Sequence, residues 1–523
     1  MDASIKDRLT QILGADNLLL DEADLAFYSQ DVSKRADFVT QAVIRPGDKE
    51  ELAAAVKASV EAGYSLFPRG GGMSYTSGYL PTNNKAITID TARMDRVLEV
   101  NTTDMYVTVE AGCRWVDLHE ALKGTGVRTP FWGTLSGIRA TVGGGMSQNS
   151  IFFGSGQHGT AADSVTGFEI VLADGSILKT GAGAQVNATP FQRHFGPDLT
   201  GIFTSDAGAL GVKATITMRL VREPEHKRFA SFDFPDYASM FAAASEVARR
   251  GIASESFGFD PYLQSQRMKR QSLASDVKSL TNVMKSSGGA FKALKEGAKV
   301  ALAGRGFMDD VQYSYHFITE AHSSVGADAA LAEIEAVCKE AGGKQIENSI
   351  PKIISANPFT PLNNAVGPEG ERWLPVHGLV PHSRAVDMMD KIEKIFADHS
   401  EEMATHDIHT GYLLATVGAS TCVLEPVFFW PDERMEIQEE IVEASAKKNF
   451  QDYGSRPDGF AAVMKVRTAL VELFKKEGAV HLQIGKAYKY REGLEPASYA
   501  LVETLKKELD PTGQINPGAL GLI

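Results

Sequence analysis

Residues 68–81 read PRGGGMSYTSGYLP and place an arginine beside three consecutive glycines and a serine. Gly70, Gly71 and Gly72 can adopt positive φ and let a large anion approach main-chain N–H groups, while Ser74 adds a hydroxyl donor. A pyrophosphate fits such a loop. A tight surface turn would also explain it, because turns favour glycine. No G-x-G-x-x-G or G-x-x-x-x-G-K-S/T pattern accompanies the loop, which disfavours the nucleotide sites built on those motifs.

A second glycine-rich segment, residues 133–160, reads GTLSGIRATVGGGMSQNSIFFGSGQHGT. It contains another triple glycine, 143–145, among hydroxyl and amide side chains. Both segments lie beside short strand patterns. Together they predict one long ligand that is held at several points.

The elements around the first loop form a β-α-β pattern. AVIRP (42–46) is typical of a short buried strand, and Asp48 with Glu51 predicts the start of a helix that ends near Gly63. A second strand, 64–69, runs directly into the glycines. Further predicted strands cover 86–90, 96–100, 105–112 and 212–221, and 168–181 is predicted to be a hairpin that turns at Asp174 and Gly175.

Composition limits the classes of function. The 523 residues, 43% of them hydrophobic, predict two or three structural units in a globular protein. A formal net charge of -13 argues against nucleic-acid binding, which needs a basic surface. Three widely spaced cysteines provide neither a disulfide framework nor a zinc motif, so we expect no metal. The absence of an apolar leader or a long apolar run predicts a cytoplasmic protein, with peripheral membrane contact left open.

Five collinear motifs carry a family resemblance: PRGGGMSY, ATVGGGMSQNS, VTGFEIVLADGSILKTGAGA, GPDLTGIFTSDAGALGV and LDPTGQINPGALG. In this order they resemble the FAD-linked oxidases of the vanillyl-alcohol oxidase and p-cresol methylhydroxylase (PCMH) superfamily, with features of glycolate oxidase and D-lactate dehydrogenase. The resemblance implies an α+β fold, in which a PCMH-type FAD-binding domain of two α/β subdomains carries a cap domain with an antiparallel sheet flanked by helices. The implied ranges are 1–225 for the FAD domain, 226–460 for the substrate-binding cap and 461–523 for a returning C-terminal segment.

The resemblance also implies which residues bind FAD. They are Pro68, Arg69, Gly70, Gly71, Gly72, Met73, Ser74, Thr141, Val142, Gly143, Gly144, Gly145, Gln148, Asn149, Ser150, Gly154, Gly211, Val212 and Asn516. Tyr75 and Tyr79 are expected to pack against the cofactor. Relatives that tether the flavin covalently have histidine where this chain has Met73, and the segment TVGAST (416–421) lacks the histidine that tethers it from the cap. Non-covalent FAD is therefore expected.

The implied reaction is hydride transfer from a small molecule to flavin N5, with oxygen, a quinone or a cytochrome as the final electron acceptor. An aromatic alcohol or 4-alkylphenol is favoured because the cap contains VFFW (427–430) beside Glu425 and only scattered cations. The tyrosine and arginine that hold a phenolate in phenol oxidases are replaced by Gly478 and Ala479. A 2-hydroxy-acid dehydrogenase and a non-catalytic flavin-binding protein are the alternatives.

Five residues are candidates for the catalytic groups: His481, Glu425, Lys486, Tyr412 and His377. His481 is either a base or substrate ligand, or a buried hydrogen-bonded histidine. Glu425 is either a catalytic carboxyl with a raised pKa or the partner of a structural cation. Tyr412 is either packed core or pocket wall.

The segment 261–305 is basic, with nine Lys or Arg residues against Asp276 and Glu296, a net of +7. A solvated surface explains it, and so does docking of an acidic electron acceptor or an anionic membrane. A homo-oligomer is also compatible with the sequence.

Overall fold

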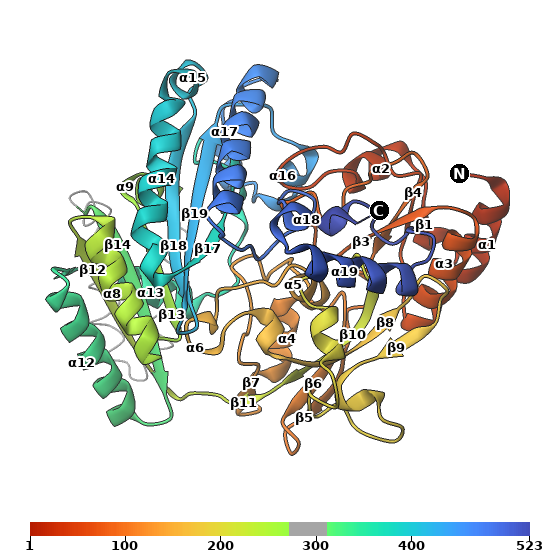
Figure 1. Cartoon of the computed structure of the whole chain (residues 1–523), viewed down its shortest axis with the longest axis horizontal. Helices are drawn as coiled ribbons and strands as arrows, with labels where there is room; N and C mark the ends of the chain where they lie inside the picture. The colour runs from red at the N-terminus through yellow and green to blue at the C-terminus, as the bar shows by residue number, and fades with distance from the viewer. Residues whose placement is uncertain (271–310, 523) are drawn as a thin grey trace.

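The computed structural model describes residues 1–270 and 311–522 (Figure 1). The first glycine loop follows the last strand of a small N-terminal sheet. The strand order is β1 (Leu18–Leu19), β2 (Ala42–Ile44), β4 (Ala86–Asp90) and β3 (Ser65–Arg69), and both β2 and β3 run parallel to β4. Helix α3 (Lys49–Glu61) connects β2 to β3. The carboxylate of Asp48 accepts the Glu51 N–H at 2.8 Å, and Gly63 has φ +78°. The predicted β-α-β unit is confirmed.

A second, antiparallel sheet packs against the first and supports the second glycine-rich segment. Its strand order is β5 (Val97–Asn101), β6 (Tyr106–Glu110), β10 (Val212–Arg219), β8 (Val165–Val171) and β9 (Ile177–Lys179). The predicted hairpin is the β8–β9 pair, whose turn is closed by hydrogen bonds between Leu172 and Ser176 and between Gly175 and Leu172. Buried residues of this sheet, Val171 and Val212, share a core with the N-terminal sheet.

The cap domain is built on a larger sheet, every pair of which is antiparallel in the described residues. The order is β15 (Lys344–Gln345), β12 (His226–Phe234), β14 (Tyr313–Ala321), β13 (Glu255–Phe259), β18 (His409–Val417), β19 (Thr421–Trp430) and β16 (Arg372–Pro375), and β17 (Gly378–Pro381) also pairs with β19. Four long helices pack on one face: α8 (Tyr237–Arg250), α12 (Ser324–Glu340), α14 (Ala385–Asp398) and α17 (Pro457–Lys476) (Figure 1). The α+β architecture with a helix-flanked antiparallel sheet is confirmed.

Side chains alternate between the two faces of this sheet. Leu414, Leu424 and Phe428 are in the core beneath the helices. Ala415, Val423 and other alternate residues belong to a separate apolar cluster on the opposite face. That opposite face is the one turned toward the glycine-rich segments.

The C-terminal segment returns to the N-terminal sheet. After α19 (Pro496–Leu509), the N–H of Leu66 in β3 donates to the carbonyl of Gln514 at 2.7 Å, and the N–H of Asn516 donates back to Leu66 at 2.8 Å. The terminus therefore lies beside the strand that leads into the first glycine loop (Figure 1).

Shorter elements complete the described chain. They are α1 (Ala3–Leu13), α2 (Glu22–Tyr28), α4 (Trp115–Leu122), β7 (Val127–Arg128), α5 (Val142–Ser147), α6 (Ser155–His158), α7 (Leu199–Ile202), β11 (Val221–Arg222), α9 (Pro261–Arg270), α13 (Ser349–Ala356), α15 (Ser400–Thr405), α16 (Glu436–Ile441) and α18 (Tyr490–Gly493). Within residues 1–270 and 311–522, no helix combines the length and the hydropathy needed to cross a bilayer. The basic segment 261–305 lies, after Arg270, outside the described residues, and its docking role stays a prediction.

Candidate active site

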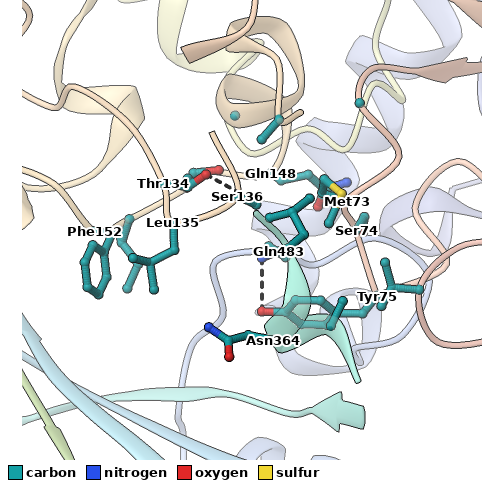
Figure 2. A pocket seen from close by; sticks show the side chains of 18 of the residues that line it. Met73, Ser74, Tyr75, Thr134, Leu135, Ser136, Gln148, Phe152, Asn364 and Gln483 are labelled. Carbon is teal, nitrogen blue, oxygen red and sulfur yellow. Dashed lines mark hydrogen bonds between the residues drawn. The ribbon is translucent and has the colours of Figure 1, made fainter. Parts of the chain in front are cut away.

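A cavity of about 960 Å³ lies between the two glycine-rich segments and the face of the cap sheet opposite the four long helices. Figure 2 shows Met73, Ser74 and Tyr75 on one side of it, Gln148 and Ser136 near its middle and Phe152 farther along. Most of the predicted FAD-binding residues line it. They are Pro68, Arg69, Gly70, Gly71, Gly72, Met73, Ser74, Thr141, Gly143, Gly144, Gly145, Gln148, Ser150, Gly211 and Val212.

The first glycine loop presents unpaired donors to this cavity. Arg69 is buried, and its Nε and Nη2 have no hydrogen-bond partner, while its guanidinium lies 4.5 Å from the centre of the Tyr28 ring. The main-chain N–H groups of residues 70–75 likewise have no acceptor within the described chain. A fixed positive charge beside free amides is the donor set that a pyrophosphate needs.

The three glycines of this loop serve different purposes. Gly72 alone has positive φ, +73°, where the sequence suggested this conformation for all three. A Cβ on Gly71 would lie 2.0 Å from the carbonyl oxygen of Arg139, and one on Gly70 would lie 2.3 Å from Oγ1 of Thr141. The bare backbone is therefore required by close contact with residues 139–141 of the second glycine-rich segment.

The second triple glycine is a packing surface rather than a set of free amides. The N–H of Gly143 donates to Ala111 at 3.0 Å, and that of Gly144 donates to Oγ1 of Thr141 at 3.1 Å. A Cβ on Gly145 would lie 2.9 Å from the Trp115 indole. Gln148 differs from these, because it is a polar side chain that lines the cavity and its buried Oε1 has no hydrogen-bond partner in the described chain.

Four predicted FAD-binding residues lie outside the cavity lining: Val142, Asn149, Gly154 and Asn516. Val142 is in the core, and the other three have positive φ that shapes the adjoining backbone. Asn516 connects two loops, since its Nδ2 donates to the carbonyls of Gly78 at 2.8 Å and Ala207 at 2.6 Å.

Lys486 stabilises the chain that follows the first glycine loop. Its Nζ donates to the carbonyls of Gly78 at 2.9 Å and Leu80 at 3.1 Å, and to Oδ1 of Asn516 at 2.7 Å. Burial lowers the pKa of Lys486 to about 7. Because the amine is surrounded by acceptors and lies outside the cavity lining, the geometry gives it a structural role and not the expected catalytic one.

Nδ1 of His481 and both ring nitrogens of His377 are engaged in hydrogen bonds. His481 donates from Nδ1 to the carbonyl of His377 at 2.8 Å, stacks on Tyr488 at 3.8 Å and lies outside the cavity lining. Burial lowers its pKa to about 4. His377 lines the cavity, but Nε2 accepts the Leu482 N–H at 3.0 Å and Nδ1 contacts the Tyr488 hydroxyl at 3.1 Å. Burial also holds the pKa of His377 well below its usual value, so it stays neutral.

Tyr412 is on the helix side of the cap sheet, away from the cavity. Its hydroxyl donates to Glu393 of α14 at 2.6 Å, whereas the next residue along β18, Leu413, lines the cavity. Glu425, which pairs with Leu413 in the strand register, lines the cavity as predicted.

Two polar residues that were not among the catalytic candidates meet at the cavity near Glu425. Nε2 of Gln483 donates to the Tyr75 hydroxyl at 3.1 Å (Figure 2), and the Tyr75 ring lies edge-on to Trp373 at 5.7 Å. Burial, and then the charge of Glu425, raise the pKa of Tyr75 well above its usual value. Tyr75 therefore remains a neutral hydroxyl. The position of Tyr75 directly after the glycine loop, and that of Gln483 in the C-terminal return, were the sequence signals that placed both residues near the cofactor.

Comparison with known proteins identifies the cofactor. Residues 40–181 match a family model described as an FAD binding domain. The chain is 28% identical over 224 residues to glycolate oxidase subunit GlcD of Bacillus subtilis, covering 43% of this chain and 46% of that protein. It is 30% identical over 239 residues to the mitochondrial D-lactate dehydrogenase (cytochrome) of Arabidopsis thaliana, covering 45% of this chain and 40% of that protein. These matches span less than half the length of each relative.

The whole chain resembles a solved structure. It superposes on p-cresol methylhydroxylase with bound substrate at a TM-score of 0.75 and 15% identity, covering 99% of this chain and 96% of that one. The two chains therefore share a fold. The unpaired donors of Arg69 and of the loop amides fit the pyrophosphate of the FAD that this domain binds.

Proposed function

We propose that this chain, which carries an FAD binding domain on the fold of p-cresol methylhydroxylase, is an FAD-dependent oxidoreductase of neutral, largely apolar alcohols or 4-alkylphenols. FAD would accept a hydride from the substrate carbon. Arg69 and the amides of residues 70–75 would hold its pyrophosphate, and the cap face of the cavity would hold the substrate.

The observation that carries the substrate class is the chemistry of that cap face. The described lining residues between 226 and 460 include no lysine or arginine. They do include three carboxyl groups, Glu255, Glu425 and Glu443. Much of the remaining wall is aromatic or aliphatic, as in Phe257, Phe259 and Trp373. Burying an apolar substrate against such a wall is favourable, whereas an unpaired carboxylate there would lose its hydration.

The pair of Tyr75 and Gln483 would hold a second polar group of the substrate, such as the ring hydroxyl of 4-hydroxybenzyl alcohol. The Tyr75 oxygen accepts its hydrogen bond from Gln483, so the phenolic hydrogen remains available to donate. The raised pKa keeps this hydrogen in place at neutral pH. No phenolate clamp is required for a neutral ring hydroxyl held in this way.

We expect 4-ethylphenol or 4-hydroxybenzyl alcohol to bleach the flavin faster than D-lactate or glycolate. The reason is the cap wall, which offers no cation to a carboxylate in the described residues. The test is the rate of flavin absorbance loss in anaerobic solution after mixing with each compound. Fast reduction by a 2-hydroxy acid, with the aromatic compounds inert, would assign the chain to the alternative class.

The 2-hydroxy-acid alternative has support in the names of the two relatives that match the FAD-binding part. A carboxylate substrate would need a cation in the cavity. Among the described lining residues the cations are Arg69, in the glycine loop, and Lys213, whose Nζ is 2.6 Å from the buried Asp206 carboxylate. Neither lies in the cap, which favours the uncharged substrate. A flavin that no compound reduces would favour the non-catalytic alternative.

Acid precipitation is expected to release the FAD into the supernatant. Met73 lines the cavity where a tethering histidine would be needed, and a thioether does not form that bond. Within the described lining the histidine is His377, and both of its ring nitrogens are engaged. Absorbance at the flavin maximum, measured in pellet and supernatant, checks this. Flavin that stays in the pellet would demonstrate a covalent link.

A further inference from the structure

Glu255 is a buried carboxyl group that lines the cavity and that the sequence did not single out. It is the first residue of β13 and is 3% exposed. Its Oε1 accepts the N–H of Gly154 at 2.9 Å, and its Oε2 is in contact with the hydroxyl of Ser254. The group is therefore fixed at the place where the cap strand meets the second glycine-rich segment.

The charges packed around Glu255 come from three neighbouring strands. Glu320 of β14 pairs with Arg128 of β7, at 3.2 Å between Nη1 and Oε1, and with Lys227 of β12 at 3.0 Å. Burial opposes ionisation of Glu320, but Lys227 and Arg128 lower its pKa to about 2. His158 of α6, close to the same charges, is neutral because burial lowers its pKa to about 4. Burial, and then the charge of Glu320, raise the pKa of Glu255 to about 7.

Ser254 can accommodate both protonation states of Glu255. Its Oγ lies 3.1 Å from the carbonyl of Ile318 as well as against Oε2 of Glu255. The hydroxyl has a single hydrogen. With Glu255 ionised, that hydrogen is donated to Oε2; with Glu255 protonated, the carboxyl donates to Oγ and the hydroxyl turns to Ile318. Gain or loss of the proton therefore leaves no buried polar atom unsatisfied.

Among the other expected bases, the two histidines are not available to a substrate, whereas Glu425 lines the cavity together with Glu255. His481 is outside the cavity lining, and His377 has both ring nitrogens hydrogen-bonded. We infer that Glu255 is the proton acceptor for the substrate hydroxyl, an inference that rests on the proposed function. For an alcohol, the C–H bond breaks and its electron pair leaves with the hydrogen to FAD. The O–H bond also breaks, its electron pair forms the C=O bond, and the proton goes to the Glu255 carboxylate. The alcohol is oxidised by two electrons and FAD is reduced by two.

Glu255→Gln should slow anaerobic reduction of the flavin by 4-hydroxybenzyl alcohol about 100-fold or more, the scale of a lost general base. Glutamine keeps the size of the side chain and an oxygen for the Gly154 N–H, so FAD content and reduction by dithionite should match the wild type. Glu255→Asp, which keeps a carboxylate, should recover part of the rate. The wild-type rate should rise with pH and level off above about 7, because only the ionised group accepts a proton. The Glu255→Gln rate should not follow this curve.

Infrared spectroscopy tests the same group without turnover. We expect a protonated-carboxyl band that disappears between pH of about 6 and 8, one unit on each side of its pKa. This band should be missing in Glu255→Gln and retained in Glu369→Gln, a control in an exposed loop. A band that disappears with a midpoint near pH 7 and persists in Glu255→Gln, or reduction of that variant at the wild-type rate, would overturn the inference. A wild-type flavin that no alcohol or phenol reduces would instead overturn the proposed function, and the catalytic role with it.

Discussion

Gly71→Val is expected to weaken FAD binding by about 10- to 100-fold, the equivalent of an overpacking strain of roughly 1–3 kcal/mol. The first atom of the new side chain would lie 2.0 Å from the carbonyl oxygen of Arg139, a backbone atom that cannot rotate away. The two glycine-rich segments would have to separate. Both of them line the cavity, so their separation would move Arg69 and the loop amides away from the pyrophosphate.

The measurement is the FAD content of the purified variant, followed by titration of the apoprotein with FAD. Gly493→Val is a matched control, because a Cβ at Gly493 meets nothing within 4 Å. We expect the control to keep wild-type occupancy. Full occupancy and unchanged affinity in Gly71→Val would mean that the contact between the two segments does not shape the FAD site.

Lys506→Met is expected to be the most destabilising single change in the C-terminal return. The buried Nζ donates to Asp510 at 2.6 Å and to the carbonyls of Ile515 at 2.6 Å and Ala209 at 2.8 Å. Removing the amine leaves the buried Asp510 carboxylate without its charge partner, with only the N–H groups of Gln514 and Ile515 as donors, and removes a donor from two buried carbonyls. Breaking a buried pair in this way costs about 3–5 kcal/mol.

Hydrogen exchange locates this effect. The Leu66 and Asn516 amides, which pair the terminus with β3, should exchange about 100-fold faster or more in Lys506→Met, as expected for a loss of roughly 3 kcal/mol of local stability. The control is Lys507→Met, because Lys507 is the next residue and is exposed. In this variant the exchange of the Leu66 and Asn516 amides should match the wild type. Equal exchange in both variants would show that Lys506 does not hold the terminus in place.

Local signals were sufficient to predict several elements of the FAD-binding part. The helix start at Asp48 and the hairpin turn at Asp174 are determined by neighbours in sequence, whereas the glycine loop depends on contact with residues 139–141, and its role in FAD binding was implied by the family resemblance. The antiparallel cap followed from the family resemblance. What the sequence did not reveal is which side of an element faces the cavity.

The alternation of side chains along a strand explains why Tyr412 lies away from the cavity. In β18 successive side chains face opposite sides, and Tyr412 packs toward α14 while Leu413 lines the cavity. For residues 481–483, the direction in which each side chain points depends on the long-range hydrogen bond from the Leu482 N–H to Nε2 of His377. Glu255 lies in SESFGF, where a glutamate between two serines is typical of an exposed strand end. Its burial depends on packing against residues far away in the chain.

The most direct measurement is an anaerobic single turnover with 4-hydroxybenzyl alcohol carrying deuterium on the benzylic carbon. If hydride leaves that carbon for FAD, one aldehyde forms per reduced flavin, and deuterium slows the loss of flavin absorbance compared with the unlabelled alcohol. We predict both results. Flavin that remains oxidised with this alcohol and with 4-ethylphenol, or flavin that is reduced without aldehyde formation, would contradict the proposed function.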